Sequence, residues 1–230
     1  PEAQIAMIEA VAATGTPLIV AIVAGSAVLV ERWRGRSAAI LQSFYSGMQG
    51  GTALARILFG DVSPSGRLPF TVARDPADYP FFDRDADAID YDYWHGYAKF
   101  ARDGTAPRYA FGHGLSYTRF EHRALRVAVS GDALAVTVTA SNIGTRPGDE
   151  SILCYVGGPG GVERWPLALK AFTRVSLQPG ESRTLTMHIR VDDLRYHDDQ
   201  THQWRLEPGD YTIVIPGDGD GDDLRAAIRL

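Results

Sequence analysis

The sequence is poor in cysteine, in net charge and in long uncharged apolar runs, and each shortage excludes a class of protein. Cys154 is the one cysteine among 230 residues, so no intrachain disulfide can form and the redox compartment stays open. The formal net charge is −5, which argues against a nucleic-acid or anionic-membrane partner, because both need clustered Lys and Arg. The uncharged run Pro17–Val30 is shorter than the roughly 20 apolar residues of a membrane span.

Residues 1–60 alternate between helical and strand patterns. Small and apolar residues repeat at helical spacing between Ala3 and Ala13, and Gly15 and Pro17 then end that helix. Leu18–Ala24 is a β-branched run without alternation, which is typical of a strand covered on both faces. The further expected elements are a short helix over Val28–Arg34, a strand over Ala38–Tyr45 and a helix over Gly50–Phe59. This order predicts right-handed crossovers on a mostly parallel sheet.

Residues 60–122 are mostly irregular but rich in rings. Ten aromatic residues lie between Tyr79 and Phe111. Disordered segments are poor in aromatic residues, so we expect an ordered loop, and a loop of this length in a compact chain is usually functional.

Residues 123–230 show the pattern of an all-β domain. Turn signals such as SGD, GGPGG and LQPGES separate short alternating segments. The expected strands are Ala124–Val129, Ala133–Ser141, Glu150–Val156, Leu167–Leu177, Ser182–Ile189 and Tyr211–Ile215. Their lengths and spacing predict an immunoglobulin- or fibronectin-like β-sandwich.

No metal or cofactor site is expected. The acidic stretch Gly217–Leu224 alternates Gly and Asp as a calcium loop does, but Asp223 and Arg229 stand where an EF-hand needs glycine and glutamate. A solvated turn is therefore favoured. His197 and His202 flank a polar hairpin tip, and one cysteine cannot contribute a Cys/His zinc set.

The segment Asp90–Tyr97 (DYDYWHGY) is the candidate ligand-binding loop. The rings of Tyr91, Trp94 and His95 are interleaved with the carboxylate of Asp92. A sugar site uses flat rings for stacking and carboxylates to accept hydrogen bonds from hydroxyl groups. Composition alone is equally consistent with an aromatic loop that fills a domain interface.

Five stretches in order along the chain carry a family resemblance: Ala38–Thr71, Tyr109–His122, Asn142–Glu150, Glu163–Met187 and Trp204–Ile215. The first two resemble the C-terminal half of the family-3 glycoside hydrolases, enzymes of the β-glucosidase and β-xylosidase type. The other three resemble the fibronectin-like domain that closes such enzymes. The resemblance implies an α/β plus all-β chain: the C-terminal part of a mostly parallel α/β sandwich (1–122), followed by a fibronectin type III-like or immunoglobulin-like β-sandwich (123–230).

The same resemblance implies a retaining mechanism with two carboxylates roughly 5–5.5 Å apart. In the family an aspartate nucleophile lies on a (β/α)₈ barrel, and the acid/base glutamate lies in a loop upstream of the helix that begins here. A barrel needs about 250 residues, so we expect neither catalytic carboxylate in this chain. Trp94, His95, Asp92 and Tyr91 are then expected to bind substrate rather than to break the bond.

The predicted function is therefore the C-terminal portion of a retaining, exo-acting β-glycosidase. Its expected partners are the N-terminal (β/α)₈-barrel polypeptide of the same enzyme and a β-linked oligosaccharide or glycoside. The first residue is Pro1, and we expect it to mark a processed or truncated chain. Two strands cannot cover the apolar faces of Leu18–Ala24, so another polypeptide is expected to complete the sheet. The alternative is a non-catalytic carbohydrate-binding or adhesion module.

Overall fold

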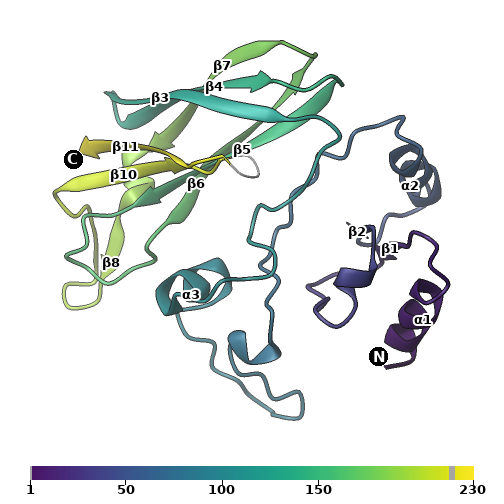
Figure 1. Cartoon of the computed structure of the whole chain (residues 1–230). Coiled ribbons are helices and arrows are strands. Elements are labelled where there is room, and N and C mark those ends of the chain that lie inside the picture. Colours follow the sequence, from purple (N-terminus) through teal and green to yellow (C-terminus); the bar gives the residue numbers. More distant parts are fainter. Residues whose placement is uncertain (1, 218–220) are drawn as a thin grey trace. The chain divides into compact units, whose positions relative to one another are not determined.

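The computed structural model describes residues 2–217 and 221–230, and it divides into two compact units (Figure 1). Unit 1 comprises residues 2–61 and Leu68–His113. Unit 2 comprises Val62–Arg67 and Gly114–Leu230. The mixed α/β class and the fibronectin-like sandwich are confirmed, whereas the division at residues 122 and 123 stays a prediction.

Unit 1 opens with a helix–strand–strand–helix order around a small parallel sheet. Helix α1 (Glu2–Ala12) precedes strand β1 (Ile19–Ile22), and strand β2 (Ala39–Gln42) precedes helix α2 (Gly50–Leu58). The two strands pair in parallel, with Ile19 opposite Ala39. The predicted parallel arrangement is therefore confirmed.

The predicted helix over Val28–Arg34 is wrong. The chain there has no regular structure over residues 28–30, turns over residues 31–33 and then forms a short 3₁₀ helix, η1 (Arg34–Arg36). Val30 and Trp33 are among the few buried apolar residues of unit 1. Packing of these two side chains therefore overrides a helical pattern that β-branched Val28 and Val30 support only weakly.

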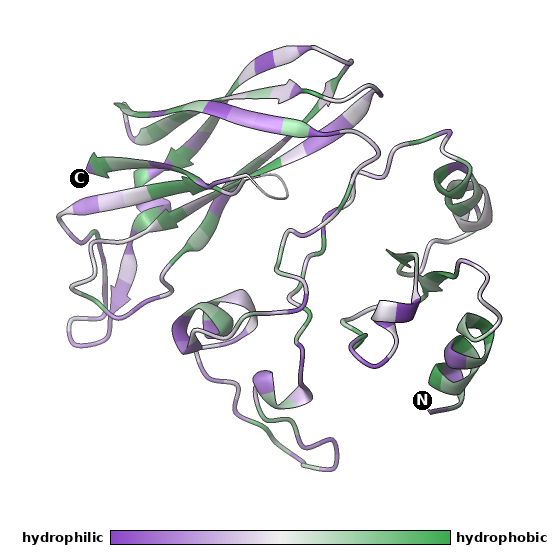
Figure 2. Ribbon diagram, viewed as in Figure 1, coloured by the Kyte–Doolittle hydropathy of each residue, from purple (hydrophilic) through white to green (hydrophobic). Residues whose placement is uncertain are grey.

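The apolar faces of this small sheet and its helices are uncovered within the described chain. Neither α1 nor α2 has a buried residue, and the ribbons of both helices contain hydrophobic residues, drawn green in Figure 2. Ile19 on β1 is 50% exposed, and Val23 and Phe59 are exposed further. The predicted cover on both faces of the first strand is thus not supplied by unit 1.

The second half of unit 1 contains more regular secondary structure than its sequence predicts. A 3₁₀ turn, η2 (Pro76–Asp78), is followed by helix α3 (Gly96–Asp103), which falls in the stretch expected to be irregular. The helix buries Ala98 and Phe100 and ends at Gly104, whose φ of 64° is left-handed. Helix α3 and η2 thus add regular structure to a ring-rich segment, and the order of the loop between them stays a prediction.

Unit 2 is a sandwich of two antiparallel sheets (Figure 1). The three-stranded sheet has the order β3 (Phe120–Ser130), β4 (Ala133–Asn142) and β7 (Ser182–Arg190). The four-stranded sheet has the order β11 (Leu224–Arg229), β10 (Asp210–Ile215), β5 (Gly148–Gly157) and β6 (Ala168–Leu177). A 3₁₀ turn, η3 (Val191–Leu194), leads into a separate hairpin of β8 (Tyr196–Asp198) and β9 (Gln203–Arg205).

The core of unit 2 follows from strict alternation along its strands. Leu134, Val136 and Val138 on β4 are completely buried, as are Ile152 on β5 and Ile213 on β10. Alternating side chains from two sheets interdigitate between them, which is why this unit has an apolar core of its own. Burial also raises the pKa of the Cys154 thiol to about 12, so this cysteine packs in the core as a thiol and does not act as a nucleophile.

A buried cluster around Glu150 fixes the segment Val62–Arg67 on the sandwich. The Arg67 guanidinium lies 2.6 Å from Glu150 Oε2, and Glu150 Oε1 lies 3.3 Å from His122 Nε2. The Glu150 side chain is only 3% exposed. The same segment is held by Ser65, whose hydroxyl accepts from the Arg174 guanidinium at 2.8 Å. A charged carboxylate at this depth destabilises the fold if its partners are removed.

Two glycines of the segment Phe111–Tyr117 (FGHGLSY) occupy positions that disfavour a side chain. Gly112 has a φ of 84°, in the left-handed region. A Cβ on Gly114 would lie 2.4 Å from the carbonyl oxygen of Gly66. The neighbouring Ser116 hydroxyl lies 2.8 Å from that of Ser63 and accepts from the Thr118 amide at 3.3 Å, which is a structural role.

Gly114→Val is expected to lower the free energy of unfolding of unit 2 by about 1–3 kcal/mol, since the new side chain forces the Gly66 backbone to move. Urea unfolding, monitored through hydrogen exchange of the backbone amides of β5, measures this change. Gly131→Val is not a fair control because its φ is positive, so Gly66→Ala, where a Cβ meets nothing within 4 Å, is the comparison. Equal stability of Gly114→Val and the parent chain would contradict the close approach.

Candidate functional site

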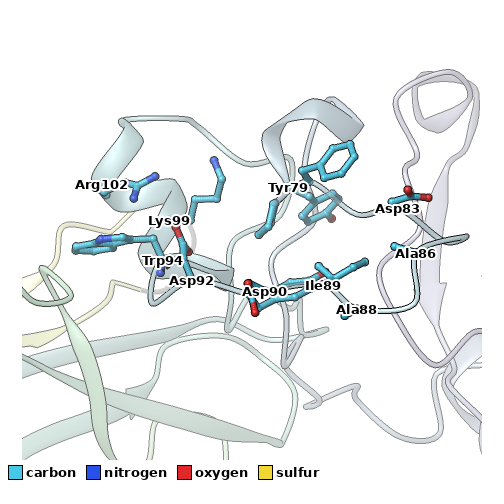
Figure 3. A pocket seen from close by; sticks show the side chains of 13 residues that line it. Tyr79, Asp83, Ala86, Ala88, Ile89, Asp90, Asp92, Trp94, Lys99 and Arg102 are labelled. Atoms are coloured by element: carbon cyan, nitrogen blue, oxygen red, sulfur yellow. Dashed lines mark hydrogen bonds between the residues drawn. The ribbon is translucent and has the colours of Figure 1, made fainter.

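A pocket of about 490 Å³ lies within unit 1, between the segment after η2, the acidic-aromatic loop and helix α3 (Figure 3). Figure 3 shows Tyr79 across from Ile89 and Asp90, with Lys99 and Arg102 contributed by α3. The lining residues are Tyr79, Pro80, Phe81, Asp83, Ala86, Ala88, Ile89, Asp90, Tyr91, Asp92, Trp94, Lys99 and Arg102. Rings and carboxylates thus alternate around one hollow.

Three of the four predicted binding residues line this pocket. They are Tyr91, Asp92 and Trp94. His95 is not among the lining residues; it precedes α3, and its Nδ1 lies 3.2 Å from the backbone oxygen of Asp92. The structure therefore brings three of the predicted side chains to one wall and leaves His95 beside it.

Local hydrogen bonding fixes the loop that carries these side chains. The Asp92 carboxylate accepts from the backbone N–H of Trp94 at 2.8 Å, which closes an Asx turn. The Trp94 indole packs edge-on against Tyr93, with ring centroids 5.3 Å apart, and the Arg102 guanidinium lies 5.0 Å from its ring centroid. A cation over an indole face is a stabilising contact, so Trp94 is held in one orientation.

The two cations of α3 share a carboxylate. Lys99 Nζ lies 2.5 Å and Arg102 Nε 2.6 Å from the carboxylate oxygens of Asp103. Arg102 first, and then Lys99, lower the pKa of Asp103 to about 2. Asp103 is therefore ionised at neutral pH and offsets much of their positive charge, which leaves rings and hydrogen-bonding groups as the main features of the pocket.

Sequence reasoning missed Tyr79, Lys99 and Arg102 as wall residues. The Tyr79 hydroxyl donates to the Thr71 carbonyl at 3.0 Å and accepts from the Ala73 amide at 2.9 Å, so its ring serves as a fixed wall. Lys99 and Arg102 are three residues apart on α3, a spacing that GYAKFARD does contain. The amphipathic pattern of that short stretch is the signal that could have found them.

The described residues contain neither a group of metal ligands nor a helix that could span a membrane. Within residues 2–217 and 221–230, no three His, Cys, Asp or Glu side chains are grouped as metal ligands. No helix in that part of the chain is both long and apolar enough to cross a membrane. Of the acidic stretch weighed as a calcium loop, Asp218 and Asp220 lie outside the described residues.

The fold defines the class of protein first: an α/β unit joined to a fibronectin-like β-sandwich. The family model "Glycosyl hydrolase family 3 C-terminal domain" matches residues 1–117, and the "Fibronectin type III-like domain" matches residues 150–218. The chain belongs to glycosyl hydrolase family 3.

Characterised relatives match the chain along its whole length but extend well beyond it. A β-glucosidase of Rhizobium radiobacter is 35% identical over 100% of this chain and 29% of its own length. An exo-α-(1→6)-L-arabinopyranosidase of Bifidobacterium longum is 34% identical over 94% of this chain and 29% of its own. The crystal structure of a family-3 β-glucosidase from Bifidobacterium adolescentis superposes with a TM-score of 0.91 at 32% identity, over 100% of this chain and 35% of that one. The chain thus spans about a third or less of these proteins.

Proposed function

We propose that this chain is the C-terminal portion of a retaining, exo-acting β-glycosidase that hydrolyses terminal β-linked sugars. The observation that carries the proposal is the match of the entire chain to 29% of a β-glucosidase. The family mechanism needs a nucleophilic aspartate and an acid/base glutamate on opposite sides of the glycosidic bond. We expect neither carboxylate in this chain, so its proposed part is to scaffold the barrel and to line the sugar site.

The proposed partner is the N-terminal (β/α)₈-barrel polypeptide of the same enzyme, which would bring both catalytic carboxylates. The exposed apolar side chains of unit 1 support this partner, because soluble proteins rarely leave such faces open. Met7 and Val11 on α1, Ile19 on β1 and Phe59 after α2 are exposed in the described chain. A barrel that also completes the sheet would bury them.

The proposed role of the pocket in unit 1 is to hold the aglycone or an outer sugar. The Trp94 indole offers an apolar face to the C–H groups of a pyranose, and Asp90 and Asp92 offer acceptors to its hydroxyl groups. Relatives at similar identity act on a β-glucoside and on an L-arabinopyranoside by name, so the sugar itself is not fixed by family membership.

Trp94→Ala in the barrel-joined enzyme is expected to raise KM for a nitrophenyl β-glucoside about tenfold with kcat within about twofold, since stacking binds ground and transition states alike. Phe82→Ala is the matched control: an exposed ring of the same loop region that does not line the pocket. An unchanged KM in Trp94→Ala would show that the loop fills an interface and does not bind substrate.

The alternative function, a non-catalytic carbohydrate-binding or adhesion module, differs in what it needs. Such a module binds sugar tightly as the isolated chain, whereas the glycosidase portion needs the barrel for its full site. Titration of the 230-residue chain with cellobiose, with and without the barrel, separates the two.

A further inference from the structure

The β8–β9 hairpin of unit 2 presents two different sides. Its register pairs Tyr196 with Arg205, His197 with Trp204 and Asp198 with Gln203. Because side chains alternate along a strand, His197 and Trp204 lie on one side and Tyr196 and Arg205 on the other. The two sides can therefore have different roles.

The side that carries Tyr196 anchors the hairpin. The Arg164 guanidinium lies 5.7 Å from the Tyr196 ring centroid, and Arg205 Nε lies 3.2 Å from Asp198. The Asp198 carboxylate also accepts from the Gln200 amide at 3.1 Å and from the Thr201 hydroxyl at 2.7 Å. These contacts hold the turn and fix the position of the opposite side.

The other side exposes an indole next to an oriented imidazole. Trp204 is 65% exposed, and the His197 ring meets it edge-on at 5.6 Å between centroids. His197 Nδ1 lies 2.9 Å from an Asp199 carboxylate oxygen, and a carboxylate only accepts, so Nδ1 donates. In the neutral ring Nε2 is then an acceptor. His202, in the left-handed region at φ 53°, places a second imidazole 6.2 Å from the first.

We propose that this side of the hairpin is a second sugar-binding site, which takes a β-linked oligosaccharide strand. Pyranose C–H groups carry partial positive charge and stack on the negative face of an indole, while the imidazoles meet the hydroxyl groups at the ring edge. Among the described residues of the hairpin, Trp204 is the one exposed large apolar side chain, and polar groups surround it. That composition fits a polar ligand with one apolar face, whereas a protein interface needs a contiguous apolar patch.

The choice of a β-linked glucan rests on the proposed function. A second site lets the enzyme retain a chain from which the active site removes terminal sugars, which raises the effective concentration of substrate. Only a substrate long enough to reach both sites gains from the second one. The second site should therefore not affect the hydrolysis of a nitrophenyl glycoside.

The test is calorimetric titration of cellopentaose into the 230-residue chain carrying Trp94→Ala, a background in which binding at the unit 1 pocket is weakened. Binding is expected, with at least about tenfold weaker affinity in Trp204→Ala and partial recovery in Trp204→Tyr. Phe172→Ala, which removes another exposed ring of unit 2, is the control and should bind as the parent does.

Three results would each contradict the proposed site: no binding by the Trp94→Ala chain, equal binding after the further change Trp204→Ala, or an equal loss after Phe172→Ala. Circular dichroism shows whether Trp204→Ala keeps its fold, and recovery in Trp204→Tyr excludes simple unfolding. Hydrolysis of a nitrophenyl β-glucoside by the barrel-joined Trp204→Ala enzyme should stay within about twofold of the parent, since stacking at Trp204 is not part of that reaction. If the parent enzyme lacks that activity while the hairpin still binds cellopentaose, the proposed function fails and this site stands.

Discussion

Replacement of Glu150 by alanine is expected to lower the free energy of unfolding of unit 2 by about 3–5 kcal/mol, the range for breaking a buried ion pair. The reason is what the substitution leaves behind. The Arg67 guanidinium, 11% exposed, loses the carboxylate 2.6 Å away, and His122 loses its contact at 3.3 Å. Water cannot fully replace Glu150 at that depth. Urea unfolding of the 230-residue chain, followed by amide exchange on β4 and β5, measures the change in the unit concerned.

The matched control is Glu121→Ala, because Glu121 also pairs with an arginine of unit 2. Its contact with Arg123 is 3.4 Å long and both side chains are about half exposed, so the expected change is below about 1 kcal/mol. Glu150→Gln keeps the volume and one acceptor, and should fall between the two alanine variants. Equal small changes in Glu150→Ala and Glu121→Ala would show that the Arg67 and His122 side chains find other partners.

The sandwich was predictable because its signal is local. Strands such as β4 alternate buried and exposed side chains residue by residue, and Gly, Pro, Asn and Asp mark the turns. The strands β8 and β9 escaped prediction because three residues carry too little alternation, and β11 (LRAAIR) escaped because Ala226 and Ala227 blur its apolar–polar pattern. The Arg67–Glu150 pair escaped for another reason: 83 residues separate its members, and no local pattern links them.

Unit 1 was predictable where periodicity is strong and not where tertiary contacts decide. The parallel pairing of β1 with β2 follows from an apolar run without alternation. Buried Trp33 and Val30 determine the path of residues 28–34, and no sequence periodicity reports that burial. Ring and carboxylate composition singled out Tyr91, Asp92 and Trp94, which line the pocket, while their role in binding substrate stays a prediction. His95, which composition singled out with them, is the N-cap residue of α3 and is not among the lining residues, and its role in binding also stays a prediction.

The second large expected effect concerns catalysis. The 230-residue chain alone should not hydrolyse a nitrophenyl β-glucoside above the buffer rate. Joined to the barrel polypeptide, it should exceed that rate by at least about 10⁶-fold, the lower end of enzymatic accelerations. Retaining hydrolysis needs two carboxylates about 5–5.5 Å apart, and we expect the barrel polypeptide to bring both of them. The barrel alone should also be nearly inactive, since a wall of its sugar site would be missing.

The measurement that tests the account most directly is this complementation assay, with the chain alone, the barrel alone and the two together at equal concentration. The account predicts the buffer rate for this chain, little activity for the barrel, and full activity with Trp94-dependent KM for the pair. Hydrolysis by the purified 230-residue chain at an enzymatic rate, abolished by heating, would contradict it.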